Sequence, residues 1–120
     1  EYQARYNKKP HFDAIGWNIY GYNITSMKSF LIRRHQEAQN RGYNVPIWVV
    51  EYSGCLTFDS GASDRAVMKA ITAWFDQKSW IDRYAWFSNR KSSSYQGEHN
   101  CILINNNNTL TTLGQIYKPF

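Results

Sequence analysis

The residue best suited to chemistry in this sequence is Glu51. It follows the apolar run Ile47–Val50, and a carboxylate in such a setting is costly to bury unless it is paired or lies at the mouth of a site. In parallel α/β folds, functional sites lie at the C-terminal ends of the strands, and Glu51 stands at such an end. The alternative is that the strand simply reaches the surface at Glu51 and that the carboxylate has no role.

Polar and aromatic side chains near the ends of two other predicted strands accompany this carboxylate. We expect Glu51 to share a strand face with Ile47 and Val49. An amide, a phenol and an indole beside a carboxylate suit sugar recognition, because rings stack on the apolar faces of sugars and polar groups bind the hydroxyls. The predicted sugar-binding residues are Asn18, Tyr20, Tyr84 and Trp86. For most of the other aromatic rings, the alternative of an ordinary place in the core holds.

Three apolar runs predict the strands that position these residues, at 12–20, 46–52 and 80–87. The run 46–52 is apolar on both faces, which is typical of a buried parallel strand. Helical patterns separate the three runs, so the order is strand, helix, strand, helix, strand, loop and helix. This alternation predicts an α/β fold with a parallel sheet and right-handed crossovers.

The first predicted strand alternates in the size of its side chains. Its large apolar residues lie on one face, and they are Ile15, Trp17 and Ile19. The other face carries Ala14, Gly16, Asn18 and Tyr20. A face that changes from small to polar along a strand indicates a crowded interior that opens into a site.

The sequence also predicts the helices between the strands. The first begins at a cap on Thr25 or Ser26 and ends at Gly42, a natural residue just beyond a helix. The second begins at a cap on Ser63, and a last helix covers 110–117. The apolar stripe of the second helix is Ala66, Val67, Ala70, Ile71, Trp74 and Phe75.

Length and composition limit the classes of protein. The chain has 120 residues, of which 42% are hydrophobic, so it can bury a core and is not intrinsically disordered. It has no run of about 18 apolar residues, so we expect no membrane span. A complete (β/α)₈ barrel needs about 250 residues, and a chain of this length cannot hold one.

The charge pattern does not favour a nucleic-acid partner. Lys and Arg number 14 and Asp and Glu number 9, for a net charge of +5, but these charges are scattered and predict a solvated basic surface. The segment 83–87 is aromatic but lacks the glycine of the RNA-recognition sheet motif. A basic nucleic-acid-binding module is therefore kept only as a third hypothesis.

The cysteines and histidines predict no metal site and no cofactor. Cys55 and Cys101 are the only cysteines, and the three histidines are widely separated. The two cysteines form a disulfide if the protein is secreted; the alternative is two unpaired thiols. Two N-glycosylation sequons, 23–25 and 107–109, favour secretion without establishing it.

Four segments, in order along the chain, resemble glycoside hydrolase family 128, the family of the alkali-sensitive linkage protein and of fungal endo-β-1,3-glucanases. Residues 46–52 resemble its Pro-(Ile/Leu)-Trp-(Val/Leu)-Thr-Glu-Phe segment, and residues 82–87 resemble its Val-Glu-Arg-Tyr-Ala-Trp-Phe strand. Residues 13–21 are similar to its Asp-x-Ile-x-x-His-x-Tyr-Gly strand, and residues 110–117 to its terminal Leu-Thr-x-Leu-Gly-x-x-Tyr. Together the four segments span nearly the whole chain.

The resemblance implies a (β/α)₈ barrel, of which residues 1–120 are the C-terminal portion: strands six to eight with their helices, within one catalytic domain. It implies that Glu51 is the nucleophile of a retaining mechanism and that Trp86 stacks beneath the sugar at the point of cleavage. The implied substrate is a β-1,3-glucan-type cell-wall polysaccharide. A secreted or wall-associated monomer is expected, and this portion alone is expected to be inactive.

The sequence departs from the family pattern at two residues near the nucleophile. Asn18 stands where the family has His, and an amide binds a hydroxyl but does not titrate. Val50 replaces the family's Thr, which removes a hydroxyl beside Glu51.

The general acid/base of the family lies on an earlier strand, before Glu1. Among the carboxylates of this chain, Asp13 and Asp82 begin strands, and Asp64 and Asp76 belong to a helix. Asp59 and Glu98 lie in loops that we expect above the C-terminal face, and Glu98 is the least unsuitable substitute. The second hypothesis is a noncatalytic carbohydrate-binding or wall-associated protein that uses the aromatic rings as a platform.

Overall fold

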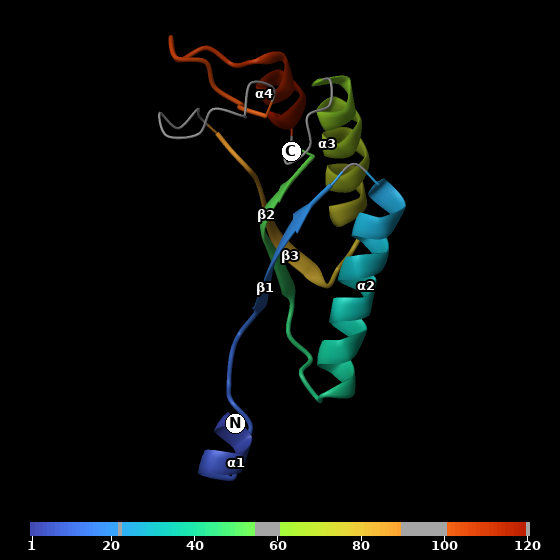
Figure 1. Cartoon of the computed structure of the whole chain (residues 1–120), viewed down its shortest axis with the longest axis vertical. Coiled ribbons are helices and arrows are strands. Elements are labelled where there is room, and N and C mark those ends of the chain that lie inside the picture. Colours follow the sequence, from blue (N-terminus) through green and yellow to red (C-terminus); the bar gives the residue numbers. More distant parts are fainter. Residues whose placement is uncertain (22, 55–60, 90–100, 120) are drawn as a thin grey trace.

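The computed structural model describes residues 1–21, 23–54, 61–89 and 101–119. Within these ranges, residues 61–63 are described by their backbone alone. The elements in chain order are α1 (Tyr2–Tyr6), β1 (Ile15–Tyr20), α2 (Ile24–Asn40), β2 (Ile47–Ser53), α3 (Gly61–Phe75), β3 (Ile81–Trp86) and α4 (Thr112–Tyr117) (Figure 1). The predicted alternation of strands and helices is confirmed. Helix α1 was not predicted; it buries none of its residues and projects away from the sheet.

The three strands form one parallel sheet in the order β1-β2-β3, so β2 is central. Helices α2 and α3 lie together on one side of this sheet (Figure 1), and no described helix covers the opposite side. We call these two sides the covered face and the open face. The radius of gyration is 16.6 Å, against about 14 Å for a compact domain of this length, so the described chain is elongated.

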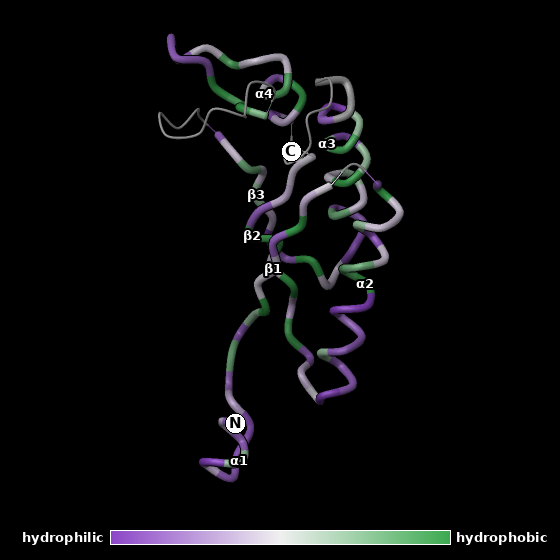
Figure 2. The backbone as a smooth tube through the Cα atoms, in the orientation of Figure 1, coloured by the Kyte–Doolittle hydropathy of each residue, from purple (hydrophilic) through white to green (hydrophobic). Residues whose placement is uncertain are grey.

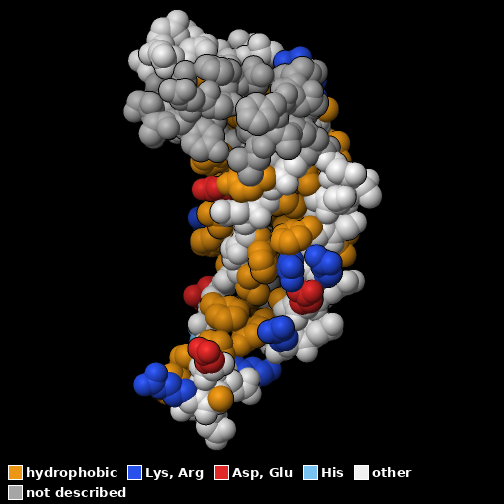
Figure 3. All heavy atoms as spheres, in the orientation of Figure 1, with side chains coloured by type: hydrophobic (Ala, Val, Ile, Leu, Met, Phe, Trp, Pro, Cys, Tyr) orange, Lys and Arg blue, Asp and Glu red, His pale blue; other side chains and the backbone are white. Residues whose placement is uncertain are grey.

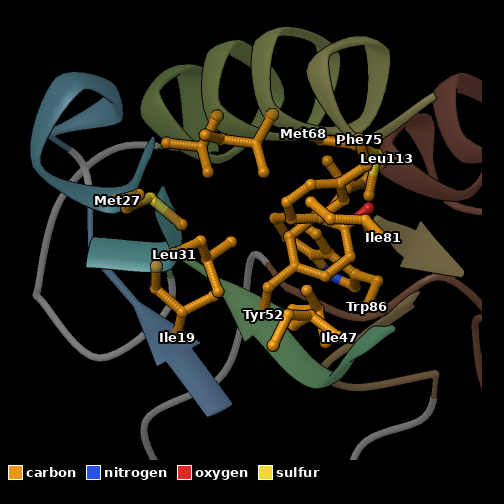
Figure 4. Close-up of a cluster of buried hydrophobic side chains, with 13 residues drawn as sticks. Ile19, Met27, Leu31, Ile47, Tyr52, Met68, Phe75, Ile81, Trp86 and Leu113 are labelled. Carbon is orange, nitrogen blue, oxygen red and sulfur yellow. The ribbon is translucent and has the colours of Figure 1, made fainter. Parts of the chain in front are cut away.

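The core fills the space between the covered face and the two long helices. Met27 and Leu31 of α2 meet Ile19 of β1, while Met68 and Phe75 of α3 lie over the central strand (Figure 4). Figure 2 shows that the end of α2 farthest from α4 and most of α1 are hydrophilic. Burial of these side chains is the main contribution to the stability of the sheet–helix layer.

The buried stripe of α3 differs from the predicted one. Ala66 is exposed, and the stripe runs through positions three and four residues apart, at Asp64, Val67, Met68, Ile71, Thr72 and Phe75. Two polar residues belong to it because they have partners there. The Thr72 hydroxyl lies 2.6 Å from the hydroxyl of buried Tyr52 on β2, so this polar pair is satisfied within the core.

The start of α2 also differs from the prediction, whereas its end agrees. Asn23 is the N-cap, with its side-chain oxygen accepting a bond of 2.9 Å from the backbone N–H of Ser26. The chain then leaves the helix through Gly42, whose φ of 78° is a left-handed conformation that favours glycine. The predicted cap at Ser63 is wrong, because helix α3 already begins at Gly61.

The close approach of α4 to the segment before it yields a first prediction. A Cβ atom on Gly114 would overlap the carbonyl oxygen of Leu103 and lie 3.0 Å from its carbonyl carbon. Because those atoms are backbone, Gly114→Ala should lower the free energy of unfolding by about 1–3 kcal/mol. Chemical denaturation of the full-length protein measures this loss. Gln115→Ala, on the exposed side of the same helix, is the control; an equal loss in both variants would contradict the explanation.

Candidate functional site

A bulge in the central strand decides where Glu51 points. Trp17 of β1 pairs with Val49 of β2, but the next residue, Asn18, pairs with Glu51. Val50 is therefore an extra residue with no partner on β1, and the same stretch also shifts against β3. Because strand side chains alternate between faces, one extra residue reverses the alternation beyond it. Glu51 thus lies on the open face, and the prediction that it shares a face with Val49 is wrong.

The open face brings Asn18 and Tyr20 to Glu51, as predicted from the alternation of the first strand. The amide nitrogen of Asn18 donates to Oε2 of Glu51 at 3.5 Å, and the hydroxyl of Tyr20 donates to the same oxygen. Within the described part of the chain, Oε1 of Glu51 has no hydrogen-bond partner. The carboxylate is therefore fixed through one oxygen while the other stays available to a ligand.

Gly16, the small residue of β1 on the open face, leaves space for the bulge at Val50. A Cβ on Gly16 would lie 2.9 Å from Cγ2 of Val50, so any larger side chain would push against the extra residue. Beside the site, a cavity of about 370 Å³ is lined by Asn18 and Tyr20 together with residues at the start of α2. The face thus changes from the small Gly16 to the polar Asn18 and Tyr20, which line this cavity.

Phe87 is the aromatic ring that the structure adds to the site. Its ring meets the ring of Tyr20 edge to face, with centroids 6.0 Å apart, and its backbone N–H donates to the carbonyl of Tyr52 at 3.1 Å. Phe87 was not among the predicted site residues, where the neighbouring residue Trp86 was named in its place. Strand alternation could have identified Phe87, because adjacent residues of a strand point to opposite faces and Trp86 lies on the covered face.

Trp86 lies on the covered face and does not reach Glu51. It is 6% exposed, packs edge-on against Tyr52 at 5.1 Å between ring centroids, and donates its indole N–H to the carbonyl of Cys101 at 2.8 Å. Figure 4 shows it among the core side chains. Trp86, which was predicted to accompany Glu51 as a sugar-binding residue, is therefore not beside it in this structure.

Tyr84 also points to the covered face, away from Glu51. Its hydroxyl donates to Asp76 at the end of α3, at 2.6 Å, and its ring packs against Phe75. Burial raises the pKa of Tyr84, and the hydrogen bond to Asp76 acts in the same direction. The phenol is thus a neutral donor that ties β3 to α3, and the sugar-binding role predicted for it has no support from its position.

The open face carries a second group of contacts toward the other end of the strands. The indole N–H of Trp48 donates to Asp82 at 2.9 Å, and the guanidinium of Arg83 lies 4.9 Å from the centre of the Trp48 ring. Trp48 is 38% exposed and Val50 is 50% exposed. The run 46–52 was predicted to be buried on both faces, yet in the described chain its open side meets solvent, and Figure 3 shows hydrophobic side chains at the surface along the sheet.

Several predicted residues lie outside the described part of the chain. These are Cys55, Asp59 and Glu98. Cys101 is buried and disulfide-bonded, which agrees with the predicted bridge. The described residues include no cluster of three or more His, Cys, Asp or Glu side chains that could hold a metal ion. No helix among them is both long enough and apolar enough to cross a membrane.

Comparison with known sequences decides the family. The profile described as glycosyl hydrolase catalytic core matches residues 1–117. The chain belongs to this family of glycosyl hydrolases. No curated protein is similar enough in sequence to give a match. The predicted resemblance to glycoside hydrolase family 128 is confirmed by solved structures of that family.

Three of these structures show how much of the fold is shared. An exo-β-1,3-glucanase from Aureobasidium namibiae has 23% identity and a TM-score of 0.75, covering 88% of this chain and 40% of the other. An endo-β-1,3-glucanase from Pseudomonas viridiflava has 26% identity and a TM-score of 0.70, covering 97% and 43%. An oligosaccharide-binding protein from Trichoderma gamsii has 14% identity and a TM-score of 0.72, covering 98% and 45%. The chain therefore spans less than half the length of these relatives.

The core position of Trp86 yields a second prediction. Trp86→Ala should lower the free energy of unfolding of the full-length protein by about 3–5 kcal/mol, because it removes a buried ring and leaves the Cys101 carbonyl without its donor. Tyr6→Ala, at an exposed aromatic residue of helix α1, should cost clearly less. Denaturant titration followed by circular dichroism measures both. An equal small loss in the two variants would show that Trp86 is not a core residue in solution.

Proposed function

We propose that this chain supplies the nucleophile end of a retaining glycoside hydrolase active site that cleaves β-1,3-glucan. The observation that carries the proposal is the carboxylate of Glu51, held through Oε2 by Asn18 and Tyr20 at the C-terminal end of the central strand. Membership of the glycosyl hydrolase family and the likeness to β-1,3-glucanases support the substrate class.

The proposal extends to the fold of the whole protein. The three parallel strands, with helices on one face only, correspond to strands six to eight of a (β/α)₈ barrel, and the open face corresponds to its interior. In support, the apolar Trp48 and Val50 meet solvent on this face, and the chain covers 40% to 43% of the first three solved relatives. The other strands of the barrel would cover these side chains.

We propose that the reaction proceeds in two steps. Oε1 attacks the anomeric carbon and forms a glycosyl ester, while the glycosidic C–O bond breaks and its oxygen takes a proton from a second carboxyl group. Water, deprotonated by that same group, then attacks the anomeric carbon and releases Glu51. The hydrogen bonds to Oε2 hold the carboxylate for in-line attack, so Asn18 and Tyr20 would act as positioning residues.

We infer that the second carboxyl group lies outside the described residues. Retaining enzymes hold the two carboxyl groups about 5–5.5 Å apart. Asp82 binds the Trp48 indole, Asp76 binds the Tyr84 hydroxyl on the covered face, and Asp64 is buried in the core stripe of α3. We propose an acid/base from another part of the protein, with Glu98 kept as a substitute within this chain.

A noncatalytic oligosaccharide-binding protein is the second candidate function. Two observations favour it: a single carboxylate stands in the site as described, and a family member of similar fold is an oligosaccharide-binding protein. Laminarin binding without release of reducing sugars would favour this candidate over the enzyme. Failure of the full-length protein to bind any β-glucan would contradict both.

The nucleophile assignment predicts the effect of one substitution. In the full-length protein, Glu51→Gln should lower laminarin hydrolysis by about 10³-fold or more, because the amide cannot form the glycosyl ester, while laminarin binding persists. Reducing-sugar release and calorimetric binding measure the two effects. Glu37→Gln, a carboxylate on α2 away from the site, should retain activity. Turnover in Glu51→Gln equal to that of wild type would disprove the assignment.

The positioning role of Tyr20 predicts a smaller effect. Tyr20→Phe removes one hydrogen bond to a charged group, worth about 1.5–3 kcal/mol, and should lower kcat by about 10- to 100-fold with little change in KM. Tyr6→Phe, on the exposed helix α1, is the control. If Tyr20→Phe raised KM and left kcat unchanged, the hydroxyl would bind substrate and would not position Glu51.

A further inference from the structure

One sequon of the chain lies at the tip of an exposed turn. Ile104 and Leu110 form an antiparallel bridge, and between them the backbone N–H of Asn105 donates to the carbonyl of Thr109 at 2.8 Å. Residues 106–110 are all exposed. The turn stands beyond the sheet, next to the start of α4 (Figure 1). A large group attached there would extend into solvent without displacing any core side chain.

The local bonds of this turn leave the acceptor nitrogen available. The side-chain oxygen of Asn107 accepts from the backbone N–H of Thr109 at 3.2 Å and from its hydroxyl at 2.7 Å. Among the described residues, the amide nitrogen Nδ2 of Asn107 has no hydrogen-bond partner. The hydroxyl that the Asn-x-Ser/Thr pattern requires is therefore already in contact with the carboxamide that would be modified.

We propose that Asn107 is an acceptor for an N-linked oligosaccharide and that Asn23, in the second sequon, carries none. In the transfer step, Nδ2 of Asn107 attacks the anomeric carbon of an oligosaccharide joined to a polyprenyl diphosphate. A C–N bond forms, the C–O bond to the diphosphate breaks, Nδ2 releases one proton and the lipid diphosphate leaves. This assignment does not depend on the proposed hydrolase activity.

The second sequon differs in its surroundings. Asn23 is the N-cap of α2, its side-chain oxygen accepts from the Ser26 backbone, and Thr25 belongs to the first helical turn. No hydrogen bond joins Asn23 to Thr25 in the described structure. Asn23 also lines the cavity of about 370 Å³ that Asn18 and Tyr20 share, so an oligosaccharide at this position would crowd the candidate site.

Glycopeptide analysis of the full-length protein tests the assignment. The protein is expressed with a secretion signal in a yeast or insect cell host and recovered from cells and medium together. Peptide N-glycosidase treatment in ¹⁸O-water then marks each occupied asparagine by its conversion to labelled aspartate. We expect label on Asn107 in most molecules and on Asn23 in few. Thr109→Ser should keep the modification, because serine also completes the sequon, whereas Asn107→Gln should remove it.

Two results would overturn the proposal. The first is an unlabelled Asn107 in a host that glycosylates a co-expressed reference protein, and the second is equal label on Asn23 and Asn107. Both are read from the unsubstituted protein, so they do not depend on whether a variant folds. Laminarin hydrolysis measured on the same preparations separates this outcome from that of the proposed function.

Discussion

The arrangement of the site depends on one irregularity, the extra residue Val50 in the central strand. Without it, the alternation of a regular strand would place Glu51 with Ile47 and Val49 on the covered face, against the apolar side chains of the helices. A carboxylate there would have to be neutralised or paired at considerable cost. The bulge instead turns Glu51 to the open face, opposite Asn18. Bulges beside active sites commonly re-aim a side chain in this way.

The remainder of the described structure holds the bulge in place from both sides. On the open face, Gly16 leaves the space that the Val50 side chain occupies. On the covered face, Tyr52 resumes the buried alternation just beyond Glu51, and its hydroxyl bonds to Thr72 on α3. Burial raises the pKa of Tyr52, so its hydroxyl stays neutral within the core. The core thus fixes the strand immediately beyond Glu51, which keeps the carboxylate and its two donors in register.

The two faces of the sheet separate the packing contacts from the candidate site. Trp86 and Tyr84 connect β3 to Cys101 and α3, and therefore belong to the packing of the layer. Phe87, Tyr20 and Glu51 belong to the open face, where the large apolar side chains of Trp48 and Val50 are exposed. This exposure fits a chain that spans less than half the length of its solved relatives.

The sequence by itself determined the α/β order, the three parallel strands, the family and the grouping of Glu51 with Asn18 and Tyr20, because these depend on local hydrophobic periodicity and on residue types at strand ends. It did not determine the faces of Glu51, Tyr84 and Trp86. The two-residue alternation of side chains predicts their faces correctly only along a regular strand. The extra residue at Val50 is visible only in the pairing of β2 with β1 and β3. The sequence also did not determine the Asn23 cap or the buried hydroxyl pair of Tyr52 and Thr72. Each of these depends on a partner that the fold brings close.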